Sequence, residues 1–548
     1  MIKQIRIQNL RSLVDTGFIE IKPLTILLGA NSSGKSTFLR SFPLFTQSVN
    51  KSLREPISWF DDAFVDFGDY DTAKSKLSAE NEGIMFSYKI QTPLNTQRRL
   101  LPFDNRSSRN KETKTSALLP DSTITLSFQK DGKGTFVNCV LFSKENLNVE
   151  FKVKERGDFV KMSVNGAPTM EDSKWNWLYG PMRKLIPNFE LQHKKEGQYT
   201  LIESLETAVD DFAYNVILKI CSNKVRKWER IMKISSDWTY NKKDFLKILQ
   251  YSDINILKKK AMEWNEDSKD FKEIYNALAL LHTIKSLDAI DEEIRSMYSN
   301  CSYIAPMRAA ANRYYRTQGL QVRDVDPYGK NLQEFISSLN GSREKSYKTF
   351  TENVLGLQVI VKNNAGHQQI FLKNKHGENN MTDVGFGYSQ ILPIITKLWH
   401  SNYCLKDNKL HFYWSESFFN TILIEQPELH LHPAMQARTA DIFMMVLNEL
   451  DKMNDNNRDK NNRRLFSKCS SSLIIETHSQ TMINRIGRRI REKRFSADKV
   501  NILMFEKNQE TGRTEIKEIK YNENGQLTNW PLGFFDPNDD IYDSLFDR

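Results

Sequence analysis

The chain has few cysteines, and no hydrophobic run in it approaches the length of a membrane span. The five cysteines lie far apart without a C-x-x-C pair, at Cys139, Cys221, Cys301, Cys404 and Cys469. This spacing indicates neither a zinc ribbon nor a disulfide framework, and it is typical of a protein in a reducing compartment. Because the amino terminus enters a strand-like alternation directly, we expect a cytoplasmic protein without an export signal or a membrane anchor.

A long internal stretch lacks the residues that break helices. Between Gly197 and Pro306 the chain contains neither proline nor glycine. Such a run is typical of helices. Thr200 and Glu203 have the spacing of a capping box, so we expect the first of these helices to begin there.

Composition divides the 548 residues into three parts. We expect an N-terminal part with an antiparallel β arm at residues 1–155, a helical insertion at 156–300, and a C-terminal part at 301–548. Apolar strands alternate with helical patterns in the first and last parts. This arrangement favours one α/β head whose two halves are separated in sequence by the β arm and the helical insertion.

The strongest pattern is a glycine-containing loop between an apolar run, residues 24–28, and a segment of helical character, residues 37–45. It fits G-x-x-x-x-G-K-[ST] and comprises Gly29, Ala30, Asn31, Ser32, Ser33, Gly34, Lys35 and Ser36, followed by Thr37. Glycines allow the tight turn in which successive N–H groups point at one anion. We expect Lys35 to reach the β- and γ-phosphates of ATP and the Ser36 hydroxyl to hold Mg²⁺.

An acidic residue ends an apolar strand in the C-terminal part. Residues 421–424 lead to Glu425, which we expect to hold the water shell of Mg²⁺ from a strand that neighbours the phosphate loop. Gln426 follows where a glutamate commonly activates the attacking water, and an amide orients water without accepting its proton. We therefore expect slow ATP hydrolysis, unless Glu428 accepts that proton.

Histidines follow both of the apolar strands in this part. Residues 472–475 lead to His478, and open α/β proteins bind ligands at the carboxyl ends of their strands, so we expect His478 to sense or polarise the γ-phosphate. His430 and His432 lie close to Glu428, which suggests a metal site. A structural connector is the alternative, and Pro433, a typical first residue of a helix, favours it.

Positive charge is in slight excess, with 78 Lys and Arg against 68 Asp and Glu and a formal net charge of +10. This balance permits contact with nucleic acid and does not require it. A basic helix from Arg485 to Arg494 would follow a nucleic-acid backbone or face solvent. A cluster of arginines and tyrosines from Arg308 to Arg316 would contact phosphate or a partner, or stack within the fold.

The motifs together resemble the ABC-type ATPase head shared by the Rad50, RecF and overcoming-lysogenization-defect (OLD) families. The resemblance implies a mixed sheet flanked by helices, an antiparallel β arm and an inserted helical domain. It also implies a homodimer, or a higher even oligomer, joined head to tail around two ATP molecules. Gly385, Gly387 and Gln390 would then belong to the signature helix that caps the partner's γ-phosphate, with residues 430–433 as the D-loop and His478 as the switch residue.

Residues 384–393, 424–433 and 530–536 narrow the resemblance to the PtuA ATPases of Septu anti-phage systems, especially those encoded beside a retron. Such ATPases assemble with a small HNH nuclease, PtuB, and the retron forms also associate with a reverse transcriptase and its RNA-linked DNA. The implied function is restraint of the nuclease until phage infection disturbs the complex.

Other functions share the same head. A nuclease of the OLD type requires a Toprim domain, and the roughly 70 residues after His478 contain no glycine-glutamate plus D-x-D pattern, which excludes it. A RecF- or Rad50-like DNA-repair ATPase and an ATP-gated scaffold with negligible turnover remain open as alternatives.

Overall fold

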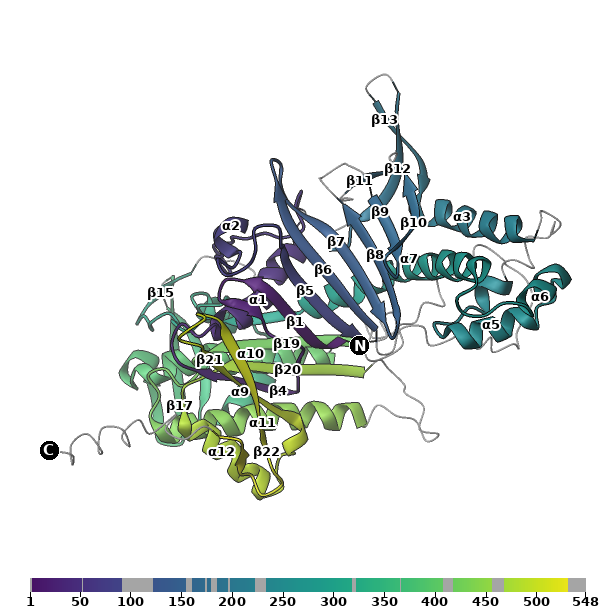
Figure 1. Ribbon diagram of the computed structural model, residues 1–548. Coiled ribbons are helices and arrows are strands. Elements are labelled where there is room, and N and C mark those ends of the chain that lie inside the picture. Colours follow the sequence, from purple (N-terminus) through teal and green to yellow (C-terminus); the bar gives the residue numbers. More distant parts are fainter. Residues whose placement is uncertain are drawn as a thin grey trace.

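The computed structural model describes residues 2–51, 53–90, 122–153, 160–172, 175–178, 185–195, 198–221, 233–317, 322–364, 366–407, 417–455 and 468–530. Within these residues the strands form four sheets, and helices pack around them (Figure 1). The closing stretch 531–536, part of the resemblance to Septu ATPases, lies outside the described residues.

A seven-stranded sheet forms the centre of the head and joins the two remote pieces of the chain. Strand β4 (Leu24–Gly29) lies between β20 and β21 of the C-terminal part and pairs with both in parallel. The spatial order is β14 (Cys301–Ile304), β19 (Ser417–Glu425), β20 (Lys468–Glu476), β4, β21 (Val500–Lys507), β22 (Thr514–Tyr521) and β23 (Leu527–Thr528). The first five strands run parallel, β22 pairs antiparallel with β21, and β23 pairs antiparallel with β22, which confirms the mixed sheet.

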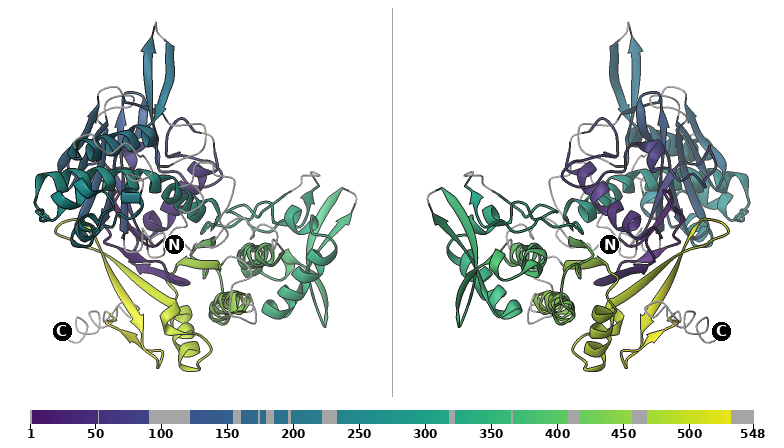
Figure 2. Two further views of the ribbon diagram at one scale, coloured as in Figure 1. Left: turned by 90° about the vertical axis from the view of Figure 1, so that its right-hand side faces the viewer. Right: turned by 90° about the vertical axis from the view of Figure 1, so that its left-hand side faces the viewer.

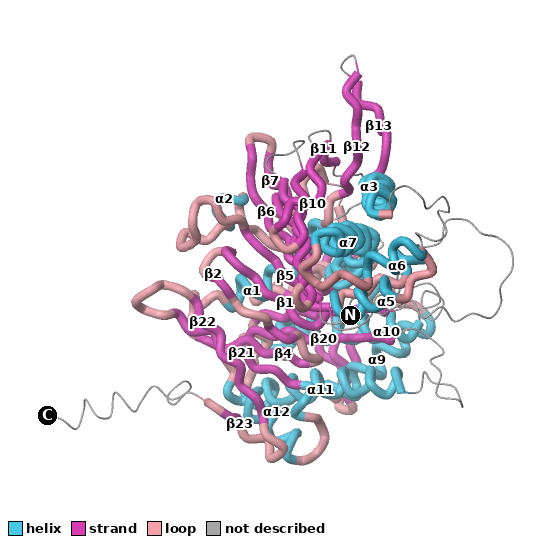
Figure 3. Tube along the Cα trace, turned by 45° about the vertical axis from the view of Figure 1, so that its right-hand side comes forward, coloured by secondary structure: helices cyan, strands magenta, loops and turns pink. Residues whose placement is uncertain are grey.

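Helices cover both faces of this sheet, as the cyan helices around the magenta strands show (Figure 3). One face packs on α1 (Lys35–Val49) and α7 (Lys269–Ser299). The other packs on α10 (Phe386–Asp407), α11 (Pro433–Asp455) and α12 (Gln480–Arg491). Along β4, Leu27 belongs to the first core, whereas Leu24, Ile26 and Leu28 belong to the second. The continuous apolar run therefore marks a strand buried on both faces.

A nine-stranded antiparallel sheet forms the β arm beside the head (Figure 1). Its strands are β1 (Ile2–Leu10), β2 (Leu13–Asp15), β3 (Ile19–Glu20), β5 (Ile84–Ile90), β6 (Ser122–Asp131), β7 (Gly134–Lys144), β8 (Leu147–Val153), β9 (Val160–Val164) and β10 (Ala167–Asp172). Every second residue of β8 is buried, from Leu147 to Val153, so one face of this strand packs on the core. The short helix α2 (Tyr70–Ala73) precedes β5.

The segment between residues 160 and 204 differs from the expected helical insertion. After β9 and β10 it forms a three-stranded antiparallel sheet of β11 (Trp175–Leu178), β12 (Asn188–Lys195) and β13 (Gln198–Ser204), and the β12–β13 hairpin projects from the body (Figure 2). The expected capping box is wrong, because Thr200 and Glu203 lie in β13 and pair with His193 and Leu191 of β12. Cross-strand pairing overrides the helical pattern here.

From Leu205 to Ser299 the described residues of the breaker-free segment, 205–221 and 233–299, are mainly helical, as predicted. They include α3 (Leu205–Ile220), α5 (Lys242–Gln250), α6 (Asn255–Ala261) and the long α7. Near the end of α7, the ring of Tyr298 stacks on Phe45 of α1 at a centroid distance of 4.6 Å. The helical segment is thus joined to the helix that follows the phosphate loop.

A smaller four-stranded antiparallel sheet lies beside the signature segment. It contains β15 (Tyr315–Arg316), β16 (Gln358–Asn364), β17 (His367–Asn374) and β18 (Gly377–Asn380), with α8 (Leu332–Ser337) and α9 (Gly341–Leu355) against it. The 3-10 helix η2 (Met381–Asp383) leads into α10, and a second one, η4 (Ala497–Lys499), precedes β21. Among the helices that the structure describes, none has the length and apolar character of a membrane span.

Candidate functional site

The glycine-containing loop connects the carboxyl end of β4 to the start of α1, which confirms its expected setting. Gly29 has φ +143° and Gly34 has φ +99°. A Cβ on Gly29 would lie 2.2 Å from the carbonyl oxygen of Phe505, and one on Gly34 would lie 2.8 Å from Ser12 Oγ. Both positions therefore require glycine for space as well as for backbone conformation. The tip, residues 30–32, is exposed to solvent.

Lys35 is almost fully buried against this loop, with 3% of its surface exposed. Its Nζ donates hydrogen bonds to the carbonyl oxygens of Gly29 at 3.0 Å and Ala30 at 2.7 Å. Burial lowers the pKa of Lys35, and the charge of Glu476, whose Oε1 lies 3.8 Å away, opposes that shift. The hydrogen bonds of the buried Lys35 ammonium thus go to neutral carbonyl oxygens, which do not neutralise its positive charge. That charge is therefore suited to an anionic ligand.

Ser36 contacts an acidic residue that sequence reasoning missed. Its Oγ donates to the carboxylate of Glu476, the last residue of β20, at 2.7 Å from Oε2 and 3.0 Å from Oε1. Burial raises the pKa of Glu476 and the neighbouring Glu425 raises it further, against the opposing effects of Ser36 and Lys35. An acid at the end of an apolar strand was the criterion that selected Glu425, and Glu476 also meets it.

Glu425 lies one strand farther from the phosphate loop than expected. Strand β20 separates β19 from β4, so β19 is not the neighbour of the loop-bearing strand. The Glu425 carboxylate accepts two hydrogen bonds from Arg40, Nε to Oε1 at 2.7 Å and Nη2 to Oε2 at 2.8 Å. Tyr303 Oη donates a third to Oε1, also at 2.7 Å. Arg40 and Tyr303 come from α1 and β14, remote parts of the chain whose contact with Glu425 no local pattern indicates.

Gln426 occupies a strained turn directly after β19. Its φ of +44° lies in the left-handed region, where residues other than glycine are uncommon. Its N–H donates to the carbonyl oxygen of Glu476 at 2.8 Å. The buried Arg308 donates to the carbonyl oxygens of Glu425 at 3.2 Å and Gln426 at 2.9 Å, and burial lowers the pKa of Arg308 to about 10. Arg308 therefore braces this turn from inside the fold.

Glu428 holds the segment that contains His478. Its Oε2 accepts from Thr477 Oγ1 at 2.7 Å, and its Oε1 accepts from the His478 N–H at 2.6 Å. Burial, and then the charge of Lys35, lower the pKa of His478. The His478 Nε2 atom is buried and has no hydrogen-bond partner among the described residues, and the same holds for Ser33 Oγ in the loop. Buried polar atoms without partners are destabilising, so both atoms are suited to a ligand.

The signature residues lie at the start of α10. Gly385 has φ +105°, and a Cβ on it would meet no neighbour, whereas a Cβ on Gly387 would lie 3.5 Å from the carbonyl oxygen of His430. The side chain of Gln390 is 1% exposed and donates to the carbonyl oxygen of Arg308 at 3.4 Å within its own head. Its contact with a partner's phosphate stays a prediction.

The two histidines beside Glu428 serve as local structure. The His430 ring packs edge-on against Phe386 at 5.0 Å, and His432 Nδ1 accepts from the N–H of Ala434 at 3.3 Å, where α11 begins. In the part of the chain that the structure describes, no group of three His, Cys, Asp or Glu residues could hold a metal ion. These contacts favour the connector over a metal site.

Some of the arginines of the basic helix form ion pairs with acidic residues of the same chain. Arg485 and Arg489 of α12 both bind Asp441 of α11, and Arg489 also binds Glu492. Exposed basic side chains remain at Arg488, Arg491, Lys493 and Arg494. Contact of this surface with nucleic acid stays a prediction.

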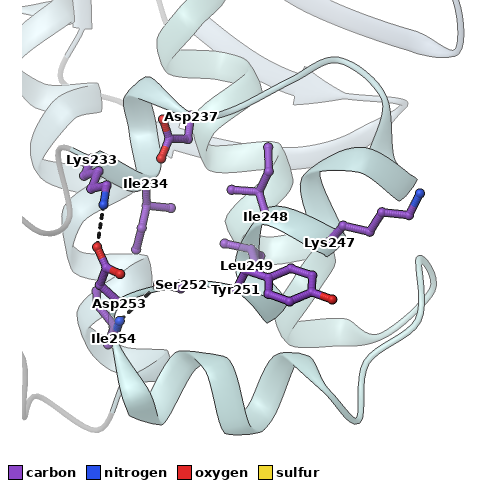
Figure 4. Close-up of a pocket in the computed structure, with 10 residues that line it drawn as sticks. All are labelled: Lys233, Ile234, Asp237, Lys247, Ile248, Leu249, Tyr251, Ser252, Asp253 and Ile254. Carbon is purple, nitrogen blue, oxygen red and sulfur yellow. Dashed lines mark hydrogen bonds and ion pairs between the residues drawn. The ribbon is translucent and has the colours of Figure 1, made fainter.

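A separate pocket of about 340 Å³ lies in the helical segment (Figure 4). Ile234, Leu249 and Ile254 contribute apolar lining, and the Lys233–Asp253 ion pair lies at one side. None of the predicted site residues lines it.

Comparison with known proteins gives a family and no curated relative. Residues 1–483 match the family model described as AAA ATPase domain, and residues 496–545 match one described as protein of unknown function (DUF3696). No curated protein matches the chain.

Among solved structures, the chain is similar to an Smc head domain with an extended coiled coil, bound to the C-terminal domain of ScpA, from Pyrococcus furiosus. The identity is 11%, the TM-score is 0.31, and the match covers 100% of this chain and 99% of that chain. The chain is also similar to the SMC head domain from Thermotoga maritima, with 8% identity and a TM-score of 0.30. That match covers 94% of this chain and 98% of that chain. The family model spans the phosphate loop, Glu425, Glu476 and His478, and the chain therefore belongs to the AAA ATPase domain family.

Proposed function

We propose that the protein binds Mg²⁺-ATP at the phosphate loop and hydrolyses it slowly. The observation that carries this proposal is the buried Nε2 of His478, which has no hydrogen-bond partner in the described part of the chain and lies where Lys35 adds positive charge. The residues present suit the nucleotide. The loop has no room for a Cβ at Gly29, and the Ser36 hydroxyl beside the Glu476 carboxylate supplies the oxygen ligands that Mg²⁺ prefers.

Each residue at this site has a separate proposed role in binding or hydrolysing the nucleotide. When bound, Mg²⁺-ATP supplies a phosphoanhydride bond whose charge the ion partly neutralises. Lys35 and the loop N–H groups bind phosphate oxygens, and His478 Nε2 completes its hydrogen bonding on the terminal phosphate. Gln426 orients water without taking its proton, and both carboxylate oxygens of Glu428 are already used by residues 477 and 478. With no free base at this turn, turnover is slow.

We further propose that this ATPase is the regulatory subunit of an anti-phage assembly that holds an HNH nuclease of the PtuB type. In the retron form, a reverse transcriptase and its RNA-linked DNA belong to the assembly. The proposal rests on the resemblance of residues 384–393 and 424–433 to PtuA ATPases. Exposed apolar side chains at Met307, Tyr314, Val384 and Phe386 support a second copy packing on the signature edge.

Phosphate release and binding of a fluorescent ATP analogue, each compared with Lys35→Ala, test the nucleotide function. We expect Lys35→Ala to abolish binding, phosphate release and phage defence. Wild-type binding without release above the Lys35→Ala background would favour the ATP-gated scaffold instead.

Co-purification with the product of a neighbouring HNH gene tests the partner. A neighbourhood without a nuclease gene would favour a DNA-repair ATPase.

A further inference from the structure

We propose that Glu476, and not Glu425, is the carboxylate that supports the Mg²⁺ ion at Ser36, and that Arg40 withholds Glu425 from that ion. The inference rests on the proposed nucleotide function and assigns a residue within the same site.

Strand order places the two glutamates at different distances from the loop. Glu425 and Glu476 are register partners at the carboxyl ends of β19 and β20. Of these two strands, β20 pairs directly with β4, whose loop leads into the helix that carries Ser36, and β19 does not. Both carboxylate oxygens of Glu476 accordingly lie within 3.0 Å of Ser36 Oγ.

The partners of the two acids differ in charge. Both oxygens of the buried Glu425 accept from the Arg40 guanidinium, which is partly exposed, and one also accepts from Tyr303, so the charge of Glu425 is matched by a bidentate partner. Moving Glu425 onto a metal would leave that cation without its partner. Glu476 contacts a neutral hydroxyl and has a lysine ammonium only at 3.8 Å. Its charge is therefore the one available to a cation at Ser36.

Neighbouring atoms point independently to a ligand at this edge. His478 follows Glu476 by two residues, and its buried Nε2 has no partner among the described residues. Ser33 is 1% exposed, and its Oγ likewise finds no partner in the part of the chain that the structure describes. Arg40 also reduces the repulsion between the neighbouring carboxylates of Glu425 and Glu476. Because Arg40 neutralises the charge of Glu425, the charge of Glu476 is left for a metal ion.

Mg²⁺-dependent binding of a fluorescent ATP analogue tests the assignment without reference to turnover. The full-length protein is titrated with Mg²⁺, and the concentration for half-maximal binding is measured. We expect Glu476→Gln to raise that concentration by about 10- to 100-fold. Glu425→Gln should raise it by a smaller factor, because Glu425 contacts Arg40 and not Ser36. The exposed control Glu518→Gln should leave it close to the wild-type value. Thermal unfolding confirms that each variant is folded.

Two further variants keep the test decisive. Should Glu476→Gln fail to fold, Glu476→Asp keeps the charge but shortens the reach, so it should raise the half-maximal Mg²⁺ concentration by a smaller factor. The double variant Arg40→Met with Glu476→Gln frees Glu425 and should recover part of the response to Mg²⁺, and no recovery would overturn the role of Arg40.

An equal or larger shift in Glu425→Gln than in Glu476→Gln, or no shift in either, would overturn the assignment of Glu476. If Lys35→Ala still abolishes binding in that case, the proposed nucleotide function stands. A wild-type protein that binds no analogue at any Mg²⁺ concentration would overturn both.

Discussion

The carboxyl edge of the seven-stranded sheet and the nine-stranded β arm bury different kinds of side chain. The edge buries Lys35, Arg308, Glu425 and Glu476, each no more than 5% exposed. The arm buries rings and branched apolar side chains, such as Phe142. Burial of charge is unfavourable unless hydrogen bonds and opposite charges offset it, whereas burial of apolar surface stabilises the fold directly. The comparison indicates that the arm mainly stabilises the fold. The edge contains the charged residues of the candidate site, whose burial is tolerated because hydrogen bonds and opposite charges offset it.

The largest expected effect is on stability, in the arm. Phe142 is fully buried, and its ring lies 6.2 Å from that of Tyr240 in the helical segment. Phe142→Ala leaves a cavity and should lower the free energy of unfolding by about 3–5 kcal/mol, measured by urea denaturation. Affinity for the ATP analogue should stay unchanged in the folded variant. Lost affinity would show that the two regions are coupled.

A smaller loss of stability is expected at the edge, together with a functional effect. Arg308→Met leaves the carbonyl oxygens of Glu425 and Gln426 without their donor and should lower the free energy of unfolding by about 2 kcal/mol. Phosphate release should also fall, because the strained Gln426 turn loses its brace. The exposed Arg491→Met is the matched control. Normal turnover in a destabilised Arg308→Met variant would make this arginine purely structural.

The next expected effect is a higher rate of ATP turnover from a substitution at the carboxyl edge of the sheet. Gln426→Glu places a proton acceptor where the amide stands and should raise turnover about tenfold, if this residue faces the attacking water. Phosphate release is compared with that of the exposed control Gln509→Glu. An unchanged rate of phosphate release would show that Gln426 is not at the water-activating position, and that Glu428 or another residue accepts the proton.

The smallest effect is expected at the partly exposed charge cluster of α11 and α12. Burial raises the pKa of Asp441, but hydrogen bonds from Arg489 and Arg485 outweigh it and bring the pKa below its usual 3.8. A lowered pKa stabilises the folded state at neutral pH, and this contribution is lost as pH falls through the folded-state pKa. Asp441→Asn should therefore cost about 1 kcal/mol at neutral pH. In urea denaturation the difference from wild type should shrink below pH 3.8, and a constant difference would contradict the charge pairing.

Local patterns predicted several parts of the head correctly. The glycines at 29 and 34, between strand and helix, identified the phosphate loop because the constraint involves only neighbouring residues. The apolar run at 24–28 indicated a strand buried on both faces. The breaker-free segment was helical only from Leu205, because the residues before it found strand partners that a local pattern does not reveal.

The sequence by itself determined the loop, the alternation of strands and helices, and the presence of an acid and a histidine after the apolar strands at 421–424 and 472–475. Only the tertiary structure decided which acid meets Ser36, because that contact joins residues 440 positions apart and depends on the order of strands in the sheet. It also decided that Arg40 neutralises Glu425 and that Gln390 turns inward. Periodicity reports which face of an element is buried, whereas the partner of a buried charge is chosen by whichever distant residue folding brings within hydrogen-bond reach.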